Sequence, residues 1–363
     1  MYHKDLQPAL NPTLNDKDKI HQNRRVNWSR VELTIECKVP KTSKDPFDES
    51  EPDNEATSDE RKRTLAQIFS YAALVFRHQQ RTSHYMILFL GHHARVIRYD
   101  RAGVYTTTKY DYVKHGSQLV EFLLKLTSSD RAARGFDTTA HRIEPTSVLG
   151  ARMRQWGLDK RQEDSDDHVQ EMWNKSLDDK YPWWKLEVYV EDNNTRDSSA
   201  SSSDPSKAPV IRTFVVGKPH FQAPGLAYRA TRGYVAVAVD SNDELHGDFV
   251  YLKDAWRVVG KDIEKEGDVL ELLKKKDVPY IPQPVCHGDV PGQITKSQVI
   301  WQKAHPGEEC SMKTHQHYRL VVQEVGRPLC DFKTGHMLIM AILCCIIGTE
   351  SIVFLHSLTD LIM

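Results

Sequence analysis

The chain has 363 residues, with 49 Lys and Arg against 50 Asp and Glu, and a formal net charge of −1 at pH 7. This balance excludes a basic nucleic-acid scaffold and an acidic solvating chain as descriptions of the whole protein. Apolar residues make up 39% of the sequence, enough for a sizeable core in about two domains of ordinary size.

Three segments lack the apolar residues that a packed core needs. Residues 1–26 contain no apolar run of the signal-peptide kind, and 41–62 and 191–209 are rich in acidic or small polar residues. We therefore expect a disordered tail and two disordered loops. The six scattered cysteines include no closely spaced metal-binding pair. Together these features predict an intracellular protein, cytoplasmic or nuclear and not secreted, without disulfides.

Periodic apolar patterns in the first half alternate between strand and helix. In chain order they predict a strand over 31–39, a helix over 63–79, strands over 84–90 and 94–99, and a helix over 118–125. The alternating residues of the first strand, from Val31 to Val39, are expected on one buried face. This order of elements indicates a mixed α/β domain over residues 27–180.

The second half is dominated by short alternating segments. They predict antiparallel strands over 184–190, 210–216, 233–240 and 247–253, a helix over 261–275, a strand over 318–323 and a hydrophobic helix that contains the apolar run 337–347. The chain as a whole is therefore predicted to be α+β, with an antiparallel sheet and one helix over 181–335 and the hydrophobic helix and tail over 336–363.

A series of short motifs follows these elements along the chain. They read ECK, QIFSYAALVFRHQQR, RVIRYDRAGV, LVEFLLKL followed by GFD, GLAYRATRGYVAV, YLKDAWR, EGDVLELL and HYRLVVQEVGRPLCDF. In order and spacing they resemble the fungal-type protein kinase family, over most of the chain. The resemblance implies a kinase small lobe over 181–335, the first large-lobe helix after it, ATP with Mg²⁺ as cofactor, and Ser/Thr hydroxyls of an unknown protein as substrate.

The resemblance assigns nucleotide contacts to a lysine and a glutamate. In protein kinases a strand lysine contacts the nucleotide phosphates, and a helix glutamate orients it. These roles fall on Lys253, at the end of a predicted strand, and on Glu266, thirteen positions later on the predicted helix. Glu264 and Glu271 are alternatives because the sequence does not fix the phase of the helix. Without the resemblance, Lys253 is equally consistent with an exposed strand-end lysine.

Two glycine-containing segments complete the expected nucleotide site. Gly225 and Gly233 bound the turn that would cover the phosphates, where backbone N–H groups approach an anion. Glu324 and Gly326 follow a predicted strand, as in the hinge whose backbone contacts adenine. An ordinary hairpin turn remains the alternative for the first segment. It is favoured by three residues that stand where such a loop prefers glycine: Ala227, Tyr228 and Ala230.

The catalytic part of a kinase is not found in this sequence. After Gly348 the chain reads TESIVFLHSLTDLIM, with His356 and Asp360 but without the arginine, asparagine and Asp-Phe-Gly of the kinase catalytic segments. We therefore assign no catalytic residue and expect no phosphoryl transfer by this chain. A natural pseudokinase and a truncated gene model both fit. A non-catalytic interaction protein with an exposed apolar C-terminal helix is the alternative function.

A second constellation lies in the first half. Glu36 and Lys38 form an E-x-K on a strand, and Gln67 and Tyr71 form a Q-x-x-x-Y on the next helix. The pattern resembles the PD-(D/E)xK nuclease fold, in which carboxylates hold Mg²⁺ and the lysine positions water. A competent site needs a second carboxylate. Its candidates lie in an unpatterned polar stretch: Asp16 and Asp18. A metal-dependent nuclease and a regulatory remnant are both left open.

The sequence contains no strong nucleic-acid signal, and no membrane association is expected. The apolar run at the C-terminus approaches the roughly 20 residues that span a bilayer. It is interrupted by Gly348 and Glu350, however, and a carboxylate inside a bilayer is costly.

Overall fold

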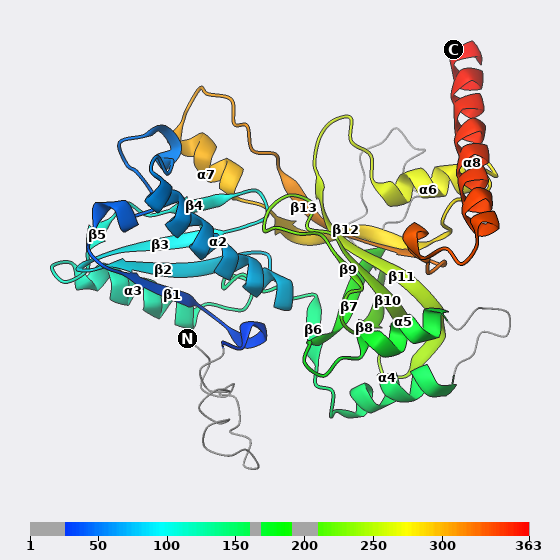
Figure 1. Cartoon of the computed structure of the whole chain (residues 1–363), viewed down its shortest axis with the longest axis horizontal. Coiled ribbons are helices and arrows are strands. Elements are labelled where there is room, and N and C mark those ends of the chain that lie inside the picture. Colours follow the sequence, from blue (N-terminus) through cyan, green and yellow to red (C-terminus); the bar gives the residue numbers. More distant parts are fainter. Residues whose placement is uncertain (1–25, 160–167, 191–209, 363) are drawn as a thin grey trace. The chain divides into compact units, whose positions relative to one another are not determined.

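The structure, a computed structural model, describes residues 26–159, 168–190 and 210–362. The predicted disordered segments 1–26 and 191–209 therefore lie outside the described residues, except for Val26. The described residues have an α+β fold with two sheets, which confirms the predicted fold class (Figure 1).

The chain forms two compact units, and each is discontinuous in sequence. The first unit contains residues 1–138, 224–230 and 293–315, and the second contains 139–223, 231–292 and 316–363. The predicted boundary between residues 180 and 181 falls inside the second of these units. The strand that follows residue 139 pairs within the second sheet, and two later segments fold with the first unit.

The described residues of the first unit form a five-stranded sheet and three α-helices. Its elements are β1 (Thr34–Lys38), α2 (Asp59–His78), β2 (His84–Leu90), β3 (His93–Tyr99), β4 (Val104–Thr106), β5 (Tyr110–Asp111), α3 (Gly116–Ser128) and α7 (Ser297–Ala304), with 3₁₀ turns at Trp28–Arg30, Thr42–Lys44 and Pro52–Asn54. The strand order is β1-β2-β3-β4, with β5 also paired to β3. Among the described strands of this sheet, β1 and β2 pair in parallel and the other pairs are antiparallel.

Helix α2 covers one face of this sheet. The Ser58 side chain accepts a hydrogen bond from the Arg61 N–H and caps the helix, so α2 begins four residues before the predicted 63–79. Its apolar stripe packs on the buried side chains of β2 and β3, and includes Ile68, Ala72 and Phe76. The predicted helix is therefore present, and the cap explains its longer N-terminal part.

The predicted orientation of the first strand is only partly correct. Val31 and Leu33 are buried, but Ile35 is 41% and Val39 54% exposed. Strand β1 lies at the edge of the sheet, and it turns its alternate residues, which include Glu36, toward α2. The apolar positions after Leu33 therefore face away from the core.

The acidic segment 41–62 is ordered, contrary to the expectation of a disordered loop. Asp45 and Phe47 are 2% and 6% exposed. The Arg95 guanidinium forms an ion pair with Asp45 at 2.8 Å, and Arg61 donates to the Asp45 carbonyl at 2.8 Å. Arg95, from β3, and Arg61, from the first turn of α2, thus hold the part of the segment around Asp45 in place. The last residues of the segment, 59–62, begin α2.

The second unit is built on an eight-stranded sheet. Its elements are β6 (Ala140–Ile143), α4 (Val148–Asp159), α5 (His168–Ser176), β7 (Trp183–Val190), β8 (Val210–Val216), β9 (Phe221–Gln222), β10 (Arg232–Val239), β11 (Leu245–Val258), α6 (Glu266–Lys275), β12 (Pro284–Ile294), β13 (His315–Val322), the 3₁₀ turn Leu329–Asp331 and α8 (Gly335–Ile362). The order is β12-β13-β11-β10-β8-β7-β6, with β9 also paired to β10.

Apolar side chains cover both faces of the second sheet. One cluster includes Leu186, Phe214 and Leu252. The other lies under α4 and α5, two helices that the periodic patterns did not reveal, and includes Trp173 and Trp183 (Figure 1). The sheet is therefore a rigid support with its side chains fixed on both faces.

The C-terminal helix α8 is apolar, and much of its described surface is exposed. Ile339 is 66% exposed, and Met337, Ile342 and Ile346 are each between 45% and 48% exposed. Within residues 26–362, apart from the two undescribed gaps, no helix meets the length and hydropathy that crossing a membrane requires.

Candidate nucleotide site

A pocket of about 800 Å³ opens on the second unit. Its walls come from β9, β11, α6, β13 and the segment after β13. Three apolar side chains line the pocket: Leu270, Leu320 and Val322. Two charged side chains, Lys253 and Glu266, line it as well. A mainly apolar pocket of this size with a few charged groups is typical of a small-molecule site.

Lys253 and Glu266 are in direct contact in this pocket. The Lys253 Nζ lies 2.5 Å from the Glu266 Oε2. Their side chains are 23% and 39% exposed, so both remain reachable from solvent. The structure selects Glu266 among the three candidates because Glu264 is exposed before α6 begins, and Glu271 contacts His287 at 3.2 Å.

The alternation of β11 directs Lys253 into the pocket. Its neighbours Leu252 and Asp254 are buried on the opposite side of the strand. The Asp254 carboxylate is hydrogen-bonded to His317 and lies 3.6 Å from the Arg319 Nε. Because successive strand residues point to opposite faces, burying Asp254 places Lys253 on the pocket face.

The charges around Asp254 keep it ionised. Burial alone would raise the pKa of Asp254, but His317, Arg319 and Arg232 outweigh that effect and hold this pKa below its ordinary value. The buried network is therefore an ionised carboxylate between His317 and two arginines, directly behind Lys253.

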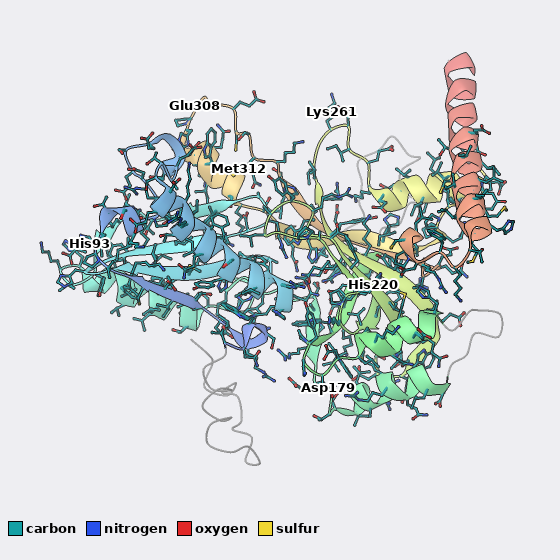
Figure 2. The ribbon with its side chains drawn as sticks, viewed as in Figure 1. His93, Asp179, His220, Lys261, Glu308 and Met312 are labelled. Carbon is teal, nitrogen blue, oxygen red and sulfur yellow. The ribbon has the colours of Figure 1, made fainter. Side chains whose placement is uncertain are left out.

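Tyr251 and His220 form an aromatic side of the pocket that the sequence reasoning missed. Their ring centroids are 5.3 Å apart, and His220, labelled in Figure 2, lies just before β9. Burial lowers the pKa of His220, so its ring is neutral at pH 7. Burial and the nearby Glu266 charge raise the pKa of Tyr251. The two rings meet edge to face, at 62°, and add an uncharged aromatic wall beside Lys253.

The predicted phosphate turn is divided between the two units. Residues 224–230 fold with the first unit. There the Arg101 guanidinium donates to the Leu226 carbonyl at 2.8 Å, and the Arg101 backbone carbonyl accepts from the Tyr228 N–H at 2.9 Å. Gly225, Tyr228 and Ala230 all have positive φ, at 96°, 71° and 42°. Tyr228 and Ala230 thus adopt a left-handed backbone conformation that favours glycine, and the turn is strained at these two residues.

Gly233 lies in β10, directly under Tyr251. A Cβ at this position would come within 2.1 Å of the Tyr251 hydroxyl oxygen. Glycine is therefore required here because the Tyr251 side chain, in the same unit, leaves no room for a Cβ. Neither Gly225 nor Gly233 is among the described residues that line the pocket.

The predicted hinge residues lie at the other end of the pocket. Glu324 and Gly326 follow β13 and line the pocket wall. The Glu324 carboxylate accepts a hydrogen bond from the Gln283 N–H at 2.8 Å, which fixes the segment after β13. Its backbone is placed beside Val322, where a flat ring could contact it.

The four residues of the nuclease-like pattern also come together, in the first unit. Lys38 Nζ lies 2.6 Å from both the Glu36 Oε1 and the Gln67 Oε1, and the Gln67 amide donates to the Tyr71 Oη at 2.6 Å. No group of three metal-binding side chains is found among the described residues. Asp16 and Asp18 lie outside those residues.

This arrangement predicts weak binding of Mg²⁺ at Glu36. Its carboxylate already contacts the Lys38 ammonium, and a hard divalent cation prefers several oxygen ligands. We expect calorimetric titration with Mg²⁺ to give the same trace for the wild type and Glu36→Gln. Saturable binding that disappears in Glu36→Gln would contradict this prediction and revive the nuclease hypothesis.

Comparison with known proteins gives one result that covers both units. No curated protein and no solved structure gives a significant match. A family model described as fungal protein kinase matches residues 14–358, nearly the whole chain. This match includes the N-terminal part of the chain. None of the comparisons supports the predicted resemblance of that part to a nuclease. The chain therefore belongs to the fungal protein kinase family.

Proposed function

We propose that the second unit binds ATP in the pocket around Lys253, as the nucleotide-binding lobe of a fungal protein kinase. The observation that carries the proposal is the 2.5 Å contact between Lys253 and Glu266 inside that pocket. In protein kinases an ion pair between a strand lysine and a helix glutamate holds the nucleotide phosphates. Family membership supports the same assignment.

Each wall of the pocket has a distinct role in this proposal. The Lys253 ammonium binds phosphate oxygens, and Glu266 orients it. Leu320 and Val322 supply apolar contact for the base, and the backbone after Glu324 supplies hydrogen bonds. Mg²⁺ accompanies the nucleotide and neutralises part of the phosphate charge.

We further propose that these 363 residues do not transfer the γ-phosphate by themselves. Among the described residues that line the pocket, the two carboxylates are Glu266 and Glu324. Glu266 is paired with Lys253, and Glu324 accepts from the Gln283 backbone. In protein kinases the residue that accepts the proton of the substrate hydroxyl is an aspartate of the catalytic loop. The protein Ser/Thr substrate of the family stays an expectation for this chain.

A thermal unfolding experiment with Mg²⁺-ATP tests nucleotide binding. Ligand at about 100 times its Kd stabilises the folded state by about 2.7 kcal/mol, which raises the Tm by several degrees. We expect this rise for the wild type and for Lys275→Ala, an exposed lysine at the end of α6. In Lys253→Ala the lost charge-assisted contact should weaken binding roughly 10- to 150-fold. This weakening removes between about half and about nine tenths of the rise at the same ligand concentration.

Two outcomes oppose the proposal. An unchanged Tm in folded wild-type protein would favour the non-catalytic interaction protein, for which the exposed apolar side chains of α8 offer a surface. A rise of equal size in the wild type and Lys253→Ala would place the nucleotide elsewhere in the molecule.

A further inference from the structure

The start of helix α6 is anchored by a side chain from the sheet. The first N–H groups of a helix have no partner within the helix. At α6 the N-cap residue, Lys265, provides no side-chain hydrogen bond. Instead, the Gly267 N–H donates to the Tyr318 Oη at 2.9 Å in a buried position. Gly267 directly follows Glu266, so this hydrogen bond fixes the turn that carries the glutamate of the ion pair.

Tyr318 is itself held firmly. It is 3% exposed and packs with Leu320, Val322 and Leu270 in one apolar cluster. It lies on β13, which is hydrogen-bonded to β11, the strand that carries Lys253. The Tyr318 hydroxyl therefore connects the first turn of α6, which carries Glu266, to β13. This strand is the neighbour of β11, which carries Lys253.

A second contact sets the distance between α6 and the sheet. A Cβ at Gly267 would lie between 2.1 and 2.5 Å from atoms of the His287 ring. His287, on β12, is 2% exposed, and its Nε2 lies 3.2 Å from the Glu271 Oε1 on the same helix. The absence of a side chain at Gly267 lets the helix rest on this ring, with Glu271 holding the ring from the next turn.

We propose that Tyr318, together with Gly267 and His287, positions Glu266 against Lys253. These are positioning residues, since they act through the ion pair and not on a ligand. The significance of this arrangement for nucleotide binding rests on the proposed function. The positioning itself is a property of the second unit alone, and it can be measured without nucleotide.

The test is the reactivity of Lys253 in the nucleotide-free protein. In an acylation the amine nitrogen attacks the reagent, so a lysine nitrogen held in an ion pair with a carboxylate reacts more slowly than an unpaired one. Modification of the peptide that contains Lys253 is followed by mass spectrometry, and Glu266→Gln defines the rate without the ion pair. Tyr318→Phe keeps the ring and removes only the hydroxyl. We expect it to raise the Lys253 rate about two- to tenfold toward the Glu266→Gln value, as expected for one lost hydrogen bond.

Three controls separate positioning from general destabilisation. Tyr99→Phe removes an equally buried hydroxyl, from the first unit, and should leave the Lys253 rate unchanged. In a Glu266→Gln background, Tyr318→Phe should add nothing, because the ion pair is already absent. Gly267→Ala should act in the same direction as Tyr318→Phe. A wild-type Lys253 rate in folded Tyr318→Phe, or an equal increase in the Glu266→Gln background, overturns the proposal.

Nucleotide affinity then distinguishes this proposal from the proposed function. If the wild type binds Mg²⁺-ATP, Tyr318→Phe should weaken binding about two- to tenfold, and this loss should vanish in a Lys253→Ala background. If the wild type binds no ATP but Tyr318→Phe still raises the Lys253 rate, the positioning holds and the proposed function fails.

Discussion

Replacing Asp254 with alanine is expected to lower the free energy of unfolding by about 3–5 kcal/mol. The carboxylate is 4% exposed, is hydrogen-bonded to His317 and lies 3.6 Å from the Arg319 Nε. Arg232, also buried, stands at the paired position on β10. Removing the carboxylate leaves the positive charges of Arg232 and Arg319 buried together, which costs far more than the loss of a surface ion pair.

Urea denaturation followed by tryptophan fluorescence measures this effect. Trp256 stacks on His317 with ring centroids 4.8 Å apart, so it reports on the network directly. Asp248→Ala is the matched control, because Asp248 is an exposed carboxylate on the same strand and should change stability by no more than about 0.5 kcal/mol. A loss below about 1 kcal/mol for Asp254→Ala would mean that His317 and the arginines are satisfied without it.

The pH dependence of this contribution has a defined sign. The pKa of Asp254 is lower in the folded protein than the ordinary value of about 3.9. The unfolded chain therefore takes up the proton first as the pH falls. The stabilisation by Asp254 is complete above about pH 5 and decreases as the pH drops below 4. The difference in stability between the wild type and Asp254→Asn should decrease over the same range.

The strands of the second unit could be predicted because their signal is local. The pattern over 210–216 coincides with β8, and that over 184–190 falls within β7. Helix α4 was missed because its few buried positions include two glycines, Gly150 and Gly157, which do not contribute to an apolar pattern. Alternation of side chains identifies a strand, whereas a short helix with a small buried face gives little periodic signal.

The residues of the candidate nucleotide site could be predicted only where segments close together in the sequence determine their positions. The thirteen-residue spacing from Lys253 to a helical glutamate was visible, but the choice among three glutamates depended on where α6 begins. That start is fixed by the Tyr318 hydroxyl, 51 residues after Gly267. Tyr251 could have been found from the alternation of its strand, since it lies two residues before Lys253 on the same face. Contacts between distant segments carry no local sequence pattern.

The same limitation explains the segment 41–62, and it gives the second large prediction. Its composition favours disorder, yet Asp45 is buried against Arg95, which lies 50 residues later and is itself 1% exposed. Arg95 also contacts Glu49 at 2.8 Å, so one guanidinium holds two acidic residues of the segment. Asp45→Ala should therefore destabilise the first unit by about 3–5 kcal/mol, because it leaves this guanidinium buried without its main partner.

Limited proteolysis and urea denaturation together check the prediction for Asp45. In the wild type the segment should resist cleavage, whereas in Asp45→Ala cleavage between residues 41 and 58 should precede cleavage elsewhere in the first unit. Glu55→Ala removes an exposed carboxylate from the same segment and should behave as the wild type. If Asp45→Ala keeps both its stability and its resistance, burial of Phe47 and the Arg61 contacts alone order this segment, and the buried ion pair contributes little.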